Sequence, residues 1–255
     1  MSRSVAIDFL PGSVAGYRDD HAIVAVDVIR ATTTAVTAAA LGWRCFPVPS
    51  LEAAVPQAAR LQNPLLVGEL GGNMPFGFDM TNSPAEMARR TDVMRPMILL
   101  STSGTQLLWE GRTAPAVYAA CLRNYRSQVK HLVGRFDKVA VIGAGSRGEF
   151  REEDQLCCAW IAEGLVGEGY QVENQTTQDA IDRWRGQPVD SFLCSHSVAY
   201  LQRTEQLRDL DFILDHVDDL QAVFALTNGE LVMRPLLDER ANHRKLPEST
   251  GNWIA

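Results

Sequence analysis

Residues 101–105 place four hydroxyl groups and a glycine directly after an apolar run at 97–100 that predicts a strand. Hydroxyl side chains and the free amides at the start of a helix can together bind a phosphate. The competing explanation is an ordinary capped helix, but such a cap needs only one hydroxyl. We therefore predict that this run, which includes Thr102, Ser103, Gly104 and Thr105, cradles a phosphate.

A second polar junction lies at the end of the strand predicted at 23–28, where Asp27 and Arg30 precede the threonines 32–34. An arginine beside the free amides of a helix start binds an oxyanion, and a carboxylate there can hold a metal ion or act as a nucleophile. A threonine-capped helix next to a surface ion pair is the alternative. The residues of this junction alone favour neither explanation, so Asp27 and Arg30 remain candidates for metal and oxyanion binding.

Two further carboxylates, Glu69 and Asp79, lie on glycine-rich backbone after the strand predicted at 65–68. Carboxylates on such a loop suit a hard, oxygen-coordinated cation such as Mg²⁺. Close by, Ser83 and Glu86 form a capping box with proline at the first helical position, which predicts a structural role for Ser83. A functional role can be added to that structural one.

The run 143–148 has the spacing G-x-G-x-x-G after a predicted strand, which is the fingerprint of dinucleotide binding. Acidic side chains crowd the helix start that follows it: Glu149, Glu152, Glu153 and Asp154. These acids would repel a pyrophosphate, whereas they would attract Mg²⁺. We interpret the run as a metal and anion loop and predict no NAD(P) binding at ordinary cofactor concentrations.

Several phosphatase classes lack their signatures in this chain. Cys121 is not followed by arginine at the spacing of a thiol phosphatase loop, and Asp27 does not belong to an Asp-x-Asp motif. Neither a Gly-x-Ser-x-Gly elbow nor a Walker lysine occurs. Phosphoryl chemistry assisted by a divalent ion remains.

Composition restricts the partners and the compartment. The 255 residues carry a net charge of −7 without a concentrated basic block, so we expect no nucleic-acid partner. No apolar run is long enough to span a membrane, and Asp8 interrupts the region of a secretory signal, which predicts a cytoplasmic protein. The odd number of cysteines, five, favours reduced thiols over disulfides or zinc. The expected partner is a small phosphorylated acid, and a homodimer is compatible with the sequence.

These junctions need a framework of parallel strands. Short apolar runs alternate with helical periodicity, which predicts an α/β protein with a three-layer α/β/α architecture and a mostly parallel, mixed sheet. The hairpin predicted around Asn228-Gly229 adds the antiparallel pair. Residues 1–240 are predicted to form a single domain, and residues 241–255 a polar C-terminal tail. The strands are predicted at 5–10, 23–28, 45–48, 65–68, 97–100, 116–119, 139–142, 170–173, 223–226 and 231–233.

The order of these motifs resembles the 2-phosphosulfolactate phosphatase family (ComB-like) over residues 8–235. The resemblance rests on short segments: 26–34, Gly68-Glu69 with Gly71, 77–79, 82–84, 101–105, Asn124, Ala144-Gly145, and Glu153-Asp154 with Cys158-Ala159.

The resemblance implies an α/β/α fold, Mg²⁺ dependence, and hydrolysis of 2-phosphosulfolactate to sulfolactate and phosphate. We assign catalytic roles to Asp27, Arg30 and the run 102–105, and metal binding to Glu69, Asp79 and Asp154. Substrate contacts are expected from Asn82, Ser83, Asn124, Gly145 and Arg147.

The chain departs from the family pattern at three positions. Leu70 replaces an arginine, Ser103 an asparagine, and Gly143 a cysteine. Because an arginine can bind an anion through two parallel hydrogen bonds, its loss at position 70 bears on sulfonate recognition. Two other functions stay open: an NAD(P)-binding oxidoreductase that uses Gly143, Gly145 and Gly148, and a non-catalytic relative that binds an anion.

Overall fold

Ten strands form one mixed sheet in the computed structural model, which describes residues 2–236. Their order across the sheet is β4-β5-β3-β10-β9-β6-β2-β7-β1-β8. Their bounds are β1 Ser4–Asp8, β2 Ala22–Val26, β3 Cys45–Val48, β4 Leu65–Gly68, β5 Met97–Leu100, β6 Ala116–Ala120, β7 Lys138–Gly143, β8 Gln171–Val172, β9 Ala222–Thr227 and β10 Glu230–Pro235.

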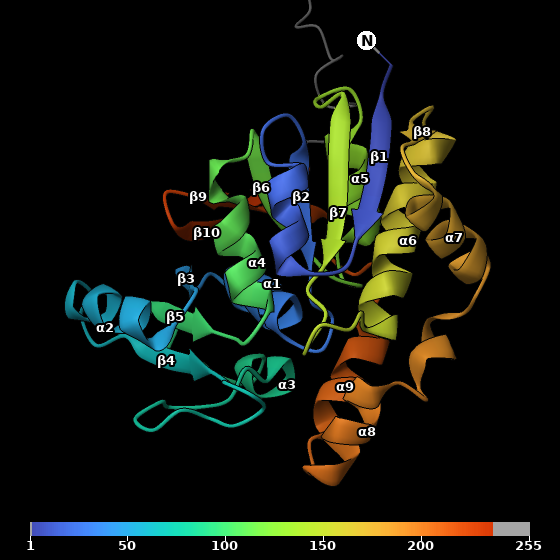
Figure 1. Ribbon diagram of the computed structural model, residues 1–255. Helices are drawn as coiled ribbons and strands as arrows, with labels where there is room; N and C mark the ends of the chain where they lie inside the picture. The colour runs from blue at the N-terminus through green and yellow to red at the C-terminus, as the bar shows by residue number, and fades with distance from the viewer. Residues whose placement is uncertain (1, 237–255) are drawn as a thin grey trace, which may run out of the picture.

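The hairpin of β9 and β10 divides the sheet into two parallel groups. All antiparallel pairings involve this hairpin, and β10 meets β3 through the single residue pair Leu231 and Cys45. Because three successive pairings are antiparallel, the group β4-β5-β3 runs opposite to the group β6-β2-β7-β1-β8 along the ladder. The twist of the sheet nevertheless turns the carboxyl ends of β5 and β7 toward the same central region (Figure 1).

Helices cover both faces of this sheet. On one face lie α1 (Ala31–Ala40) and α4 (Gly104–Glu110), and on the other α5 (Tyr125–Leu132), α6 (Glu152–Gly167) and α7 (Gln175–Trp184). Successive strand residues point to opposite faces, so in β2 Ile23 packs into the first layer and Val24 into the second. The predicted three-layer architecture with a mixed, mostly parallel sheet is confirmed.

Four further α-helices lie in the described chain. α2 (Leu51–Ala59) packs on β3 and β5, whereas α3 (Pro84–Met87) contacts α9 (Leu207–Asp215), which in turn contacts α8 (His196–Arg203). Figure 1 places α8 and α9 below the start of α6. The sequence prediction left residues 175–215 unassigned, so α7, α8 and α9 are additions to it.

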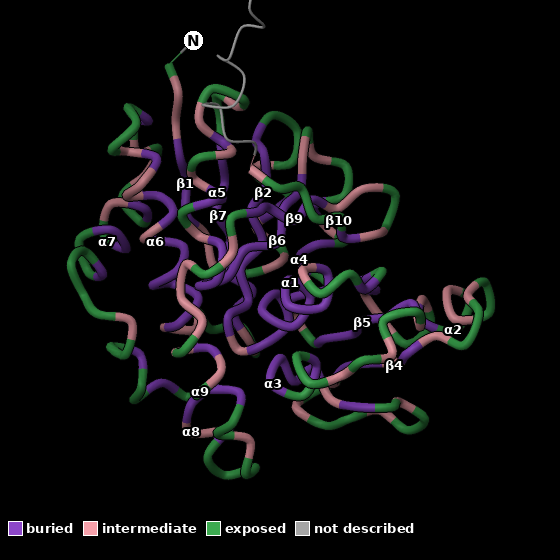
Figure 2. Tube along the Cα trace, turned by 180° about the vertical axis from the view of Figure 1, so that it is seen from behind, coloured by how far each residue is buried: buried purple, intermediate pink, exposed green. Residues whose placement is uncertain are grey.

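Burial follows the layers, with buried strands in the interior and exposed residues along the outer helices and loops (Figure 2). All five cysteines are free thiols, and four of them are buried. Among residues 2–236, no helix has both the length and the apolar character required to cross a bilayer. The tail predicted at 241–255 lies outside the described residues.

Candidate active site

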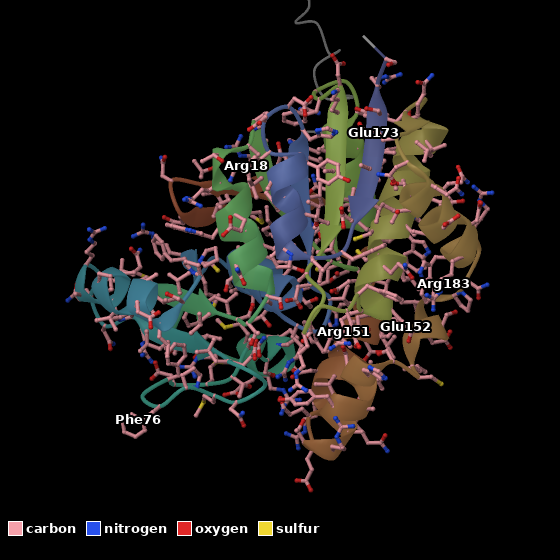
Figure 3. All side chains as sticks on the ribbon, in the orientation of Figure 1. Arg18, Phe76, Arg151, Glu152, Glu173 and Arg183 are labelled. Carbon is pink, nitrogen blue, oxygen red and sulfur yellow. The ribbon has the colours of Figure 1, made fainter. Side chains whose placement is uncertain are left out.

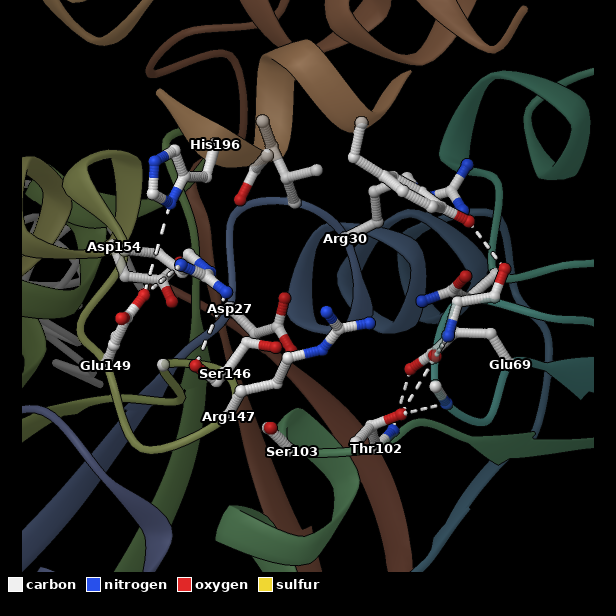
Figure 4. Close-up of a pocket in the computed structure, with 18 of the residues that line it drawn as sticks. Asp27, Arg30, Glu69, Thr102, Ser103, Ser146, Arg147, Glu149, Asp154 and His196 are labelled. Atoms are coloured by element: carbon white, nitrogen blue, oxygen red, sulfur yellow. Dashed lines mark hydrogen bonds and ion pairs between the residues drawn. The ribbon is translucent and has the colours of Figure 1, made fainter. Parts of the chain in front are cut away.

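A cavity of about 580 Å³ lies where the carboxyl ends of β2, β4, β5 and β7 meet the helices that follow them. Its size is typical of a small-molecule site. Figure 4 shows the side chains that converge on it. The predicted site residues that line this cavity are Asp27, Arg30, Glu69, Asn82, Thr102, Ser103, Gly145, Arg147 and Asp154.

Asp27 lies between the end of β2 and the start of α1. Its Oδ1 atom accepts a hydrogen bond of 3.1 Å from the Ala31 amide, so the carboxylate occupies the position of an anion at a helix N-terminus. Thr32 fixes the same turn, because its hydroxyl accepts from the Asp27 amide and donates to the Ala120 carbonyl. The threonine cluster at 32–34 therefore shapes the backbone that presents Asp27.

Asp154 reaches the same place from the first turn of α6. Its Oδ1 atom accepts a 2.7 Å hydrogen bond from the amide of Val28, the neighbour of Asp27 in the chain. Burial raises the pKa of Asp154 well above its usual range, and the charges of Asp27 and Glu153 raise it further. Burial also raises the pKa of Asp27, to about 7. Two buried carboxylates that oppose each other's ionisation form a place where a cation would be stabilised.

Glu69 has a different environment, although it too lines the cavity. Its Oε1 atom accepts from the Thr102 amide at 2.7 Å, and its Oε2 atom accepts from the Gly72 amide and the Thr102 hydroxyl. Three hydrogen bonds already satisfy this carboxylate. Glu69 therefore ties the loop after β4 to the loop after β5, which orders two walls of the cavity.

Asp79, the third predicted metal ligand, does not line the cavity. Its backbone and side chain pair with Leu66 of the edge strand β4, and its carboxylate contacts Arg95 at 3.2 Å. Asp79 thus covers the outer edge of the sheet. Within residues 2–236, no group of three or more His, Cys, Asp and Glu side chains is arranged to hold a metal ion.

The hydroxyl run at 101–105 divides into structural and accessible members. Ser101 and Thr105 cap each other through reciprocal hydrogen bonds between side chain and amide, and both are buried outside the cavity lining. Thr102 binds Glu69 and accepts from the Gly71 amide. Ser103 lines the cavity, and its hydroxyl makes no hydrogen bond within the described part of the chain. Ser103 is therefore the hydroxyl available to a ligand.

Two of the residues predicted to bind substrate form hydrogen bonds with backbone amides and do not line the cavity. Asn124 is fully buried and accepts from the Cys121 amide at 2.9 Å. Ser83 caps α3 by accepting from the Glu86 amide, as the capping box predicts. Neither residue lines the cavity, so the predicted junctions converge only in part.

Arginine side chains line the same cavity as Asp27 and Asp154, which are called the acidic pair below. Arg30 is buried, and Arg147 extends into the cavity from the loop after β7 (Figure 4). Arg151 lies at the start of α6, next to α8 and α9, and lines the same cavity (Figure 3). Arginines beside carboxylates allow one cavity to bind a cation and an anion together.

Sequence reasoning missed the wall that α8 contributes. His196, Tyr200 and Arg203 line the cavity from one face of this helix, at spacings of four and three residues. Tyr200 donates a hydrogen bond to the Gly72 carbonyl and so joins α8 to the loop after β4. The helical spacing of these polar residues was the available signal. It corresponds to no catalytic motif.

Glu153 was also outside the predicted set, although it precedes Asp154. Its side chain is fully buried, and neither carboxylate oxygen has a hydrogen-bond partner among the described residues. Burial raises its pKa.

The glycine run at 143–148 forms a closed turn. Ser146 and Glu149 exchange backbone hydrogen bonds, and Gly145 has a φ of 56°. A β-carbon on Gly145 would lie 2.5 Å from the Phe9 carbonyl oxygen and 2.6 Å from that of Glu149. A side chain at position 145 would therefore clash with the backbone, so this turn requires glycine.

Comparisons with known proteins agree on one family. The family model described as 2-phosphosulpholactate phosphatase matches residues 10–229. A probable 2-phosphosulfolactate phosphatase of Pseudothermotoga lettingae is 35% identical over 172 residues, which cover 68% of this chain and 70% of that protein. Similar proteins with the same description occur in Synechococcus sp. WH7803 (30% identical; 82% of this chain, 87% of that protein) and Thermus thermophilus (31%; 81% and 87%).

Proposed function

The chain belongs to the 2-phosphosulpholactate phosphatase family, and from that premise we propose that it hydrolyses 2-phosphosulfolactate to sulfolactate and inorganic phosphate with Mg²⁺ as its cofactor. The observation that carries the proposal is the buried pair Asp27 and Asp154, which faces a cavity lined by arginines. A phosphate monoester needs both features, because its charge must be held and then neutralised as the ester bond breaks.

The donor set fits Mg²⁺. This ion keeps several waters and uses one or two protein carboxylates together with substrate oxygens. Asp27 and Asp154 would hold it, since their mutual repulsion is relieved by a divalent cation. When bound, the ion supplies charge neutralisation on the phosphoryl oxygens. Glu69 orders the surrounding loops in this assignment, and Asp79 is not needed as a ligand.

The protein's own groups bind the ester. Arg30 and Arg147 present cationic donors to the phosphoryl oxygens, and the Ser103 hydroxyl adds a neutral one. Arg30 is already held by the Asp209 carboxylate before the substrate arrives, so this donor needs little reorganisation during the reaction. Arg203 lines the cavity from α8, the helix that Tyr200 joins to Gly72, and suits a second anionic group of the same substrate. A molecule with phosphate, carboxylate and sulfonate groups matches this distribution of charge.

The decisive experiment is a phosphate-release screen of the purified protein across phosphorylated hydroxy acids and sulfonic acids, with Mg²⁺ and with excess EDTA. We expect release from 2-phosphosulfolactate with Mg²⁺, loss of release with EDTA, and recovery when Mg²⁺ is added back. Full turnover in excess EDTA contradicts the metal assignment. Preference for a phosphorylated carboxylic acid contradicts the substrate assignment.

The two alternatives have separate tests. Saturable NAD(H) binding at micromolar cofactor would support an oxidoreductase, and we expect none because the acidic side chains in the first turn of α6 would repel a pyrophosphate. Phosphate binding without release from any phosphorylated acid would identify a non-catalytic relative.

A further inference from the structure

The Arg30 side chain is held by residues at the start of α9. Its side chain is 4% exposed, and its Nη1 atom donates to both the Asp209 carboxylate and the Gln206 side-chain oxygen. Gln206 immediately precedes α9, and Asp209 lies in its first turn. Both hydrogens of Nη1 are thereby used. The Nε and Nη2 atoms make no hydrogen bond within residues 2–236, and the residue lines the cavity.

Asp209 is itself fixed by a third segment. It is 2% exposed, and its Oδ1 atom accepts from the Ser83 hydroxyl at 2.5 Å and from the Ala85 amide at 3.2 Å. Its Oδ2 atom accepts from Arg30. One buried carboxylate therefore joins the starts of α1, α3 and α9. This junction also gives Ser83 a contact beyond its capping role.

The Asp209 carboxylate counteracts the attraction of Arg30 toward Asp27 and Asp154. Arg30 is close enough to Asp27 for its charge to lower the pKa of that carboxyl, against the larger effect of burial. With no acceptor on its far side, a long guanidinium side chain would be drawn toward the Asp27 and Asp154 pair. There it would neutralise the acids and leave the anion without a donor.

We infer that Asp209 is a positioning residue, which holds Arg30 by Nη1 so that the Nε and Nη2 edge faces the cavity as a fork for an oxyanion. This inference rests on the proposed function only in taking the oxyanion to be a phosphoryl group. A planar fork of two parallel N–H donors suits phosphate. Its binding depends on orientation, which Asp209 and Gln206 supply.

The test is a double-mutant cycle of Arg30→Ala and Asp209→Asn, with inorganic phosphate affinity by calorimetry as its readout and Asp211→Asn as the matched control. Asp211 is exposed on the same helix. We expect each single variant to weaken phosphate binding by roughly tenfold or more, and the double variant to bind as weakly as Arg30→Ala. The control should bind as the natural protein does. Additive losses in the double variant would overturn the inference, because Asp209 would then act independently of Arg30.

Chemical rescue separates positioning from general stability. Free guanidinium ion should restore part of the phosphate affinity of Arg30→Ala, since Asp209 and Gln206 still offer acceptors, and should restore none in the double variant. Equal rescue of Arg30→Ala and of the double variant would contradict the inference. If Asp209→Asn does not fold, Gln206→Ala removes the other acceptor, and its smaller loss should vanish in the Arg30→Ala background. A protein that binds phosphate with this coupling but releases none from 2-phosphosulfolactate would refute the proposed function alone.

Discussion

The Asp27 carboxylate lies directly against Gly104 at the start of α4: a β-carbon on Gly104 would be 2.3 Å from Asp27 Oδ2 and 2.7 Å from the Ala31 β-carbon. Gly104 has no left-handed backbone that would require glycine, so the contact is purely steric. The glycine of the hydroxyl run is thus explained by what it leaves room for. Position 104 sets where the Asp27 carboxylate can lie.

Gly104→Ala should therefore reduce activity without a conformational penalty on the backbone. The added methyl displaces Asp27, and a misplacement of about 1 Å in an active site can cost on the order of 100-fold in kcat/KM. Gly167→Ala in α6 is the control, since a β-carbon there meets nothing within 4 Å. Comparison of kcat/KM values, with circular dichroism to verify folding, checks this. Unchanged kinetics of Gly104→Ala would show that Asp27 tolerates displacement.

Asp154→Asn should lose activity strongly while the protein stays folded. The amide retains an oxygen for the Val28 amide but loses the charge that a cation needs, so we expect kcat/KM to fall by roughly 100-fold or more. Glu152→Gln is the matched control in the same turn, because Glu152 pairs with Arg183 on the outer side of α6 (Figure 3). The measurement is Mg²⁺-dependent phosphate release. Equal activities of the two variants would exclude Asp154 from the metal site.

The stability of the metal-free protein should depend on pH through the acidic pair. Burial raises the pKa of Asp27 from 3.8 to about 7 and raises that of Asp154 as well, so the folded protein binds more protons than the unfolded chain between these values. This contribution to stability is fully present below about pH 4 and is lost as pH rises through about 7. Asp154→Asn should consequently melt higher than the natural protein at about pH 8 without metal, with a smaller difference at about pH 5.

Mg²⁺ should reverse the order of the two melting temperatures near pH 8, so that the natural protein melts higher than Asp154→Asn. The ion stabilises the natural protein because it binds the folded state, and it stabilises Asp154→Asn less. In a domain of this size, 1 kcal/mol corresponds to roughly 2–4 °C in melting temperature, which thermal denaturation resolves. Lower melting of Asp154→Asn in EDTA near pH 8 would mean that repulsion between the acids is absent.

Leu70→Arg should shift substrate preference toward the sulfonate. Leu70 does not line the cavity, but it begins the turn that it closes with Asn73, and Gly71 and Gly72 within that turn do line it. A guanidinium restored there adds a donor fork, and we expect roughly a tenfold rise in the ratio of kcat/KM for 2-phosphosulfolactate over a carboxylate analogue. Leu51→Arg, equally exposed at 36% but outside the lining, is the control. An unchanged ratio would mean that the side chain at position 70 does not contribute to recognition of the sulfonate.

The sheet was predictable because its strands are short apolar runs bounded by turn residues. The strands predicted at 45–48, 65–68 and 97–100 have the observed bounds, since each is a continuous apolar run that is buried except at Leu66. The opposite direction of the two parallel groups was not predictable. It depends on where the hairpin inserts, and that is a long-range pairing with no local signal.

The acidic pair was partly accessible to sequence reasoning, because Asp27 and Asp154 both lie where a strand connects to the helix that follows it. Asp79 has the same local signature, yet it faces the edge of β4, and residue type alone does not distinguish the two environments. Asp209 was missed for the opposite reason. Its importance comes from three contacts with segments more than a hundred residues away.

The central place of the β9–β10 hairpin bears on how the protein is made. Every residue that lines the cavity precedes Ala222, where the hairpin begins. Glu69 and Thr102 follow strands of one parallel group, whereas Asp27 and Asp154 follow strands of the other. A nascent chain that has not yet released residues 222–235 from the ribosome carries all of these side chains but lacks the strands that join the two groups. Ligand binding should therefore begin only when the hairpin has emerged.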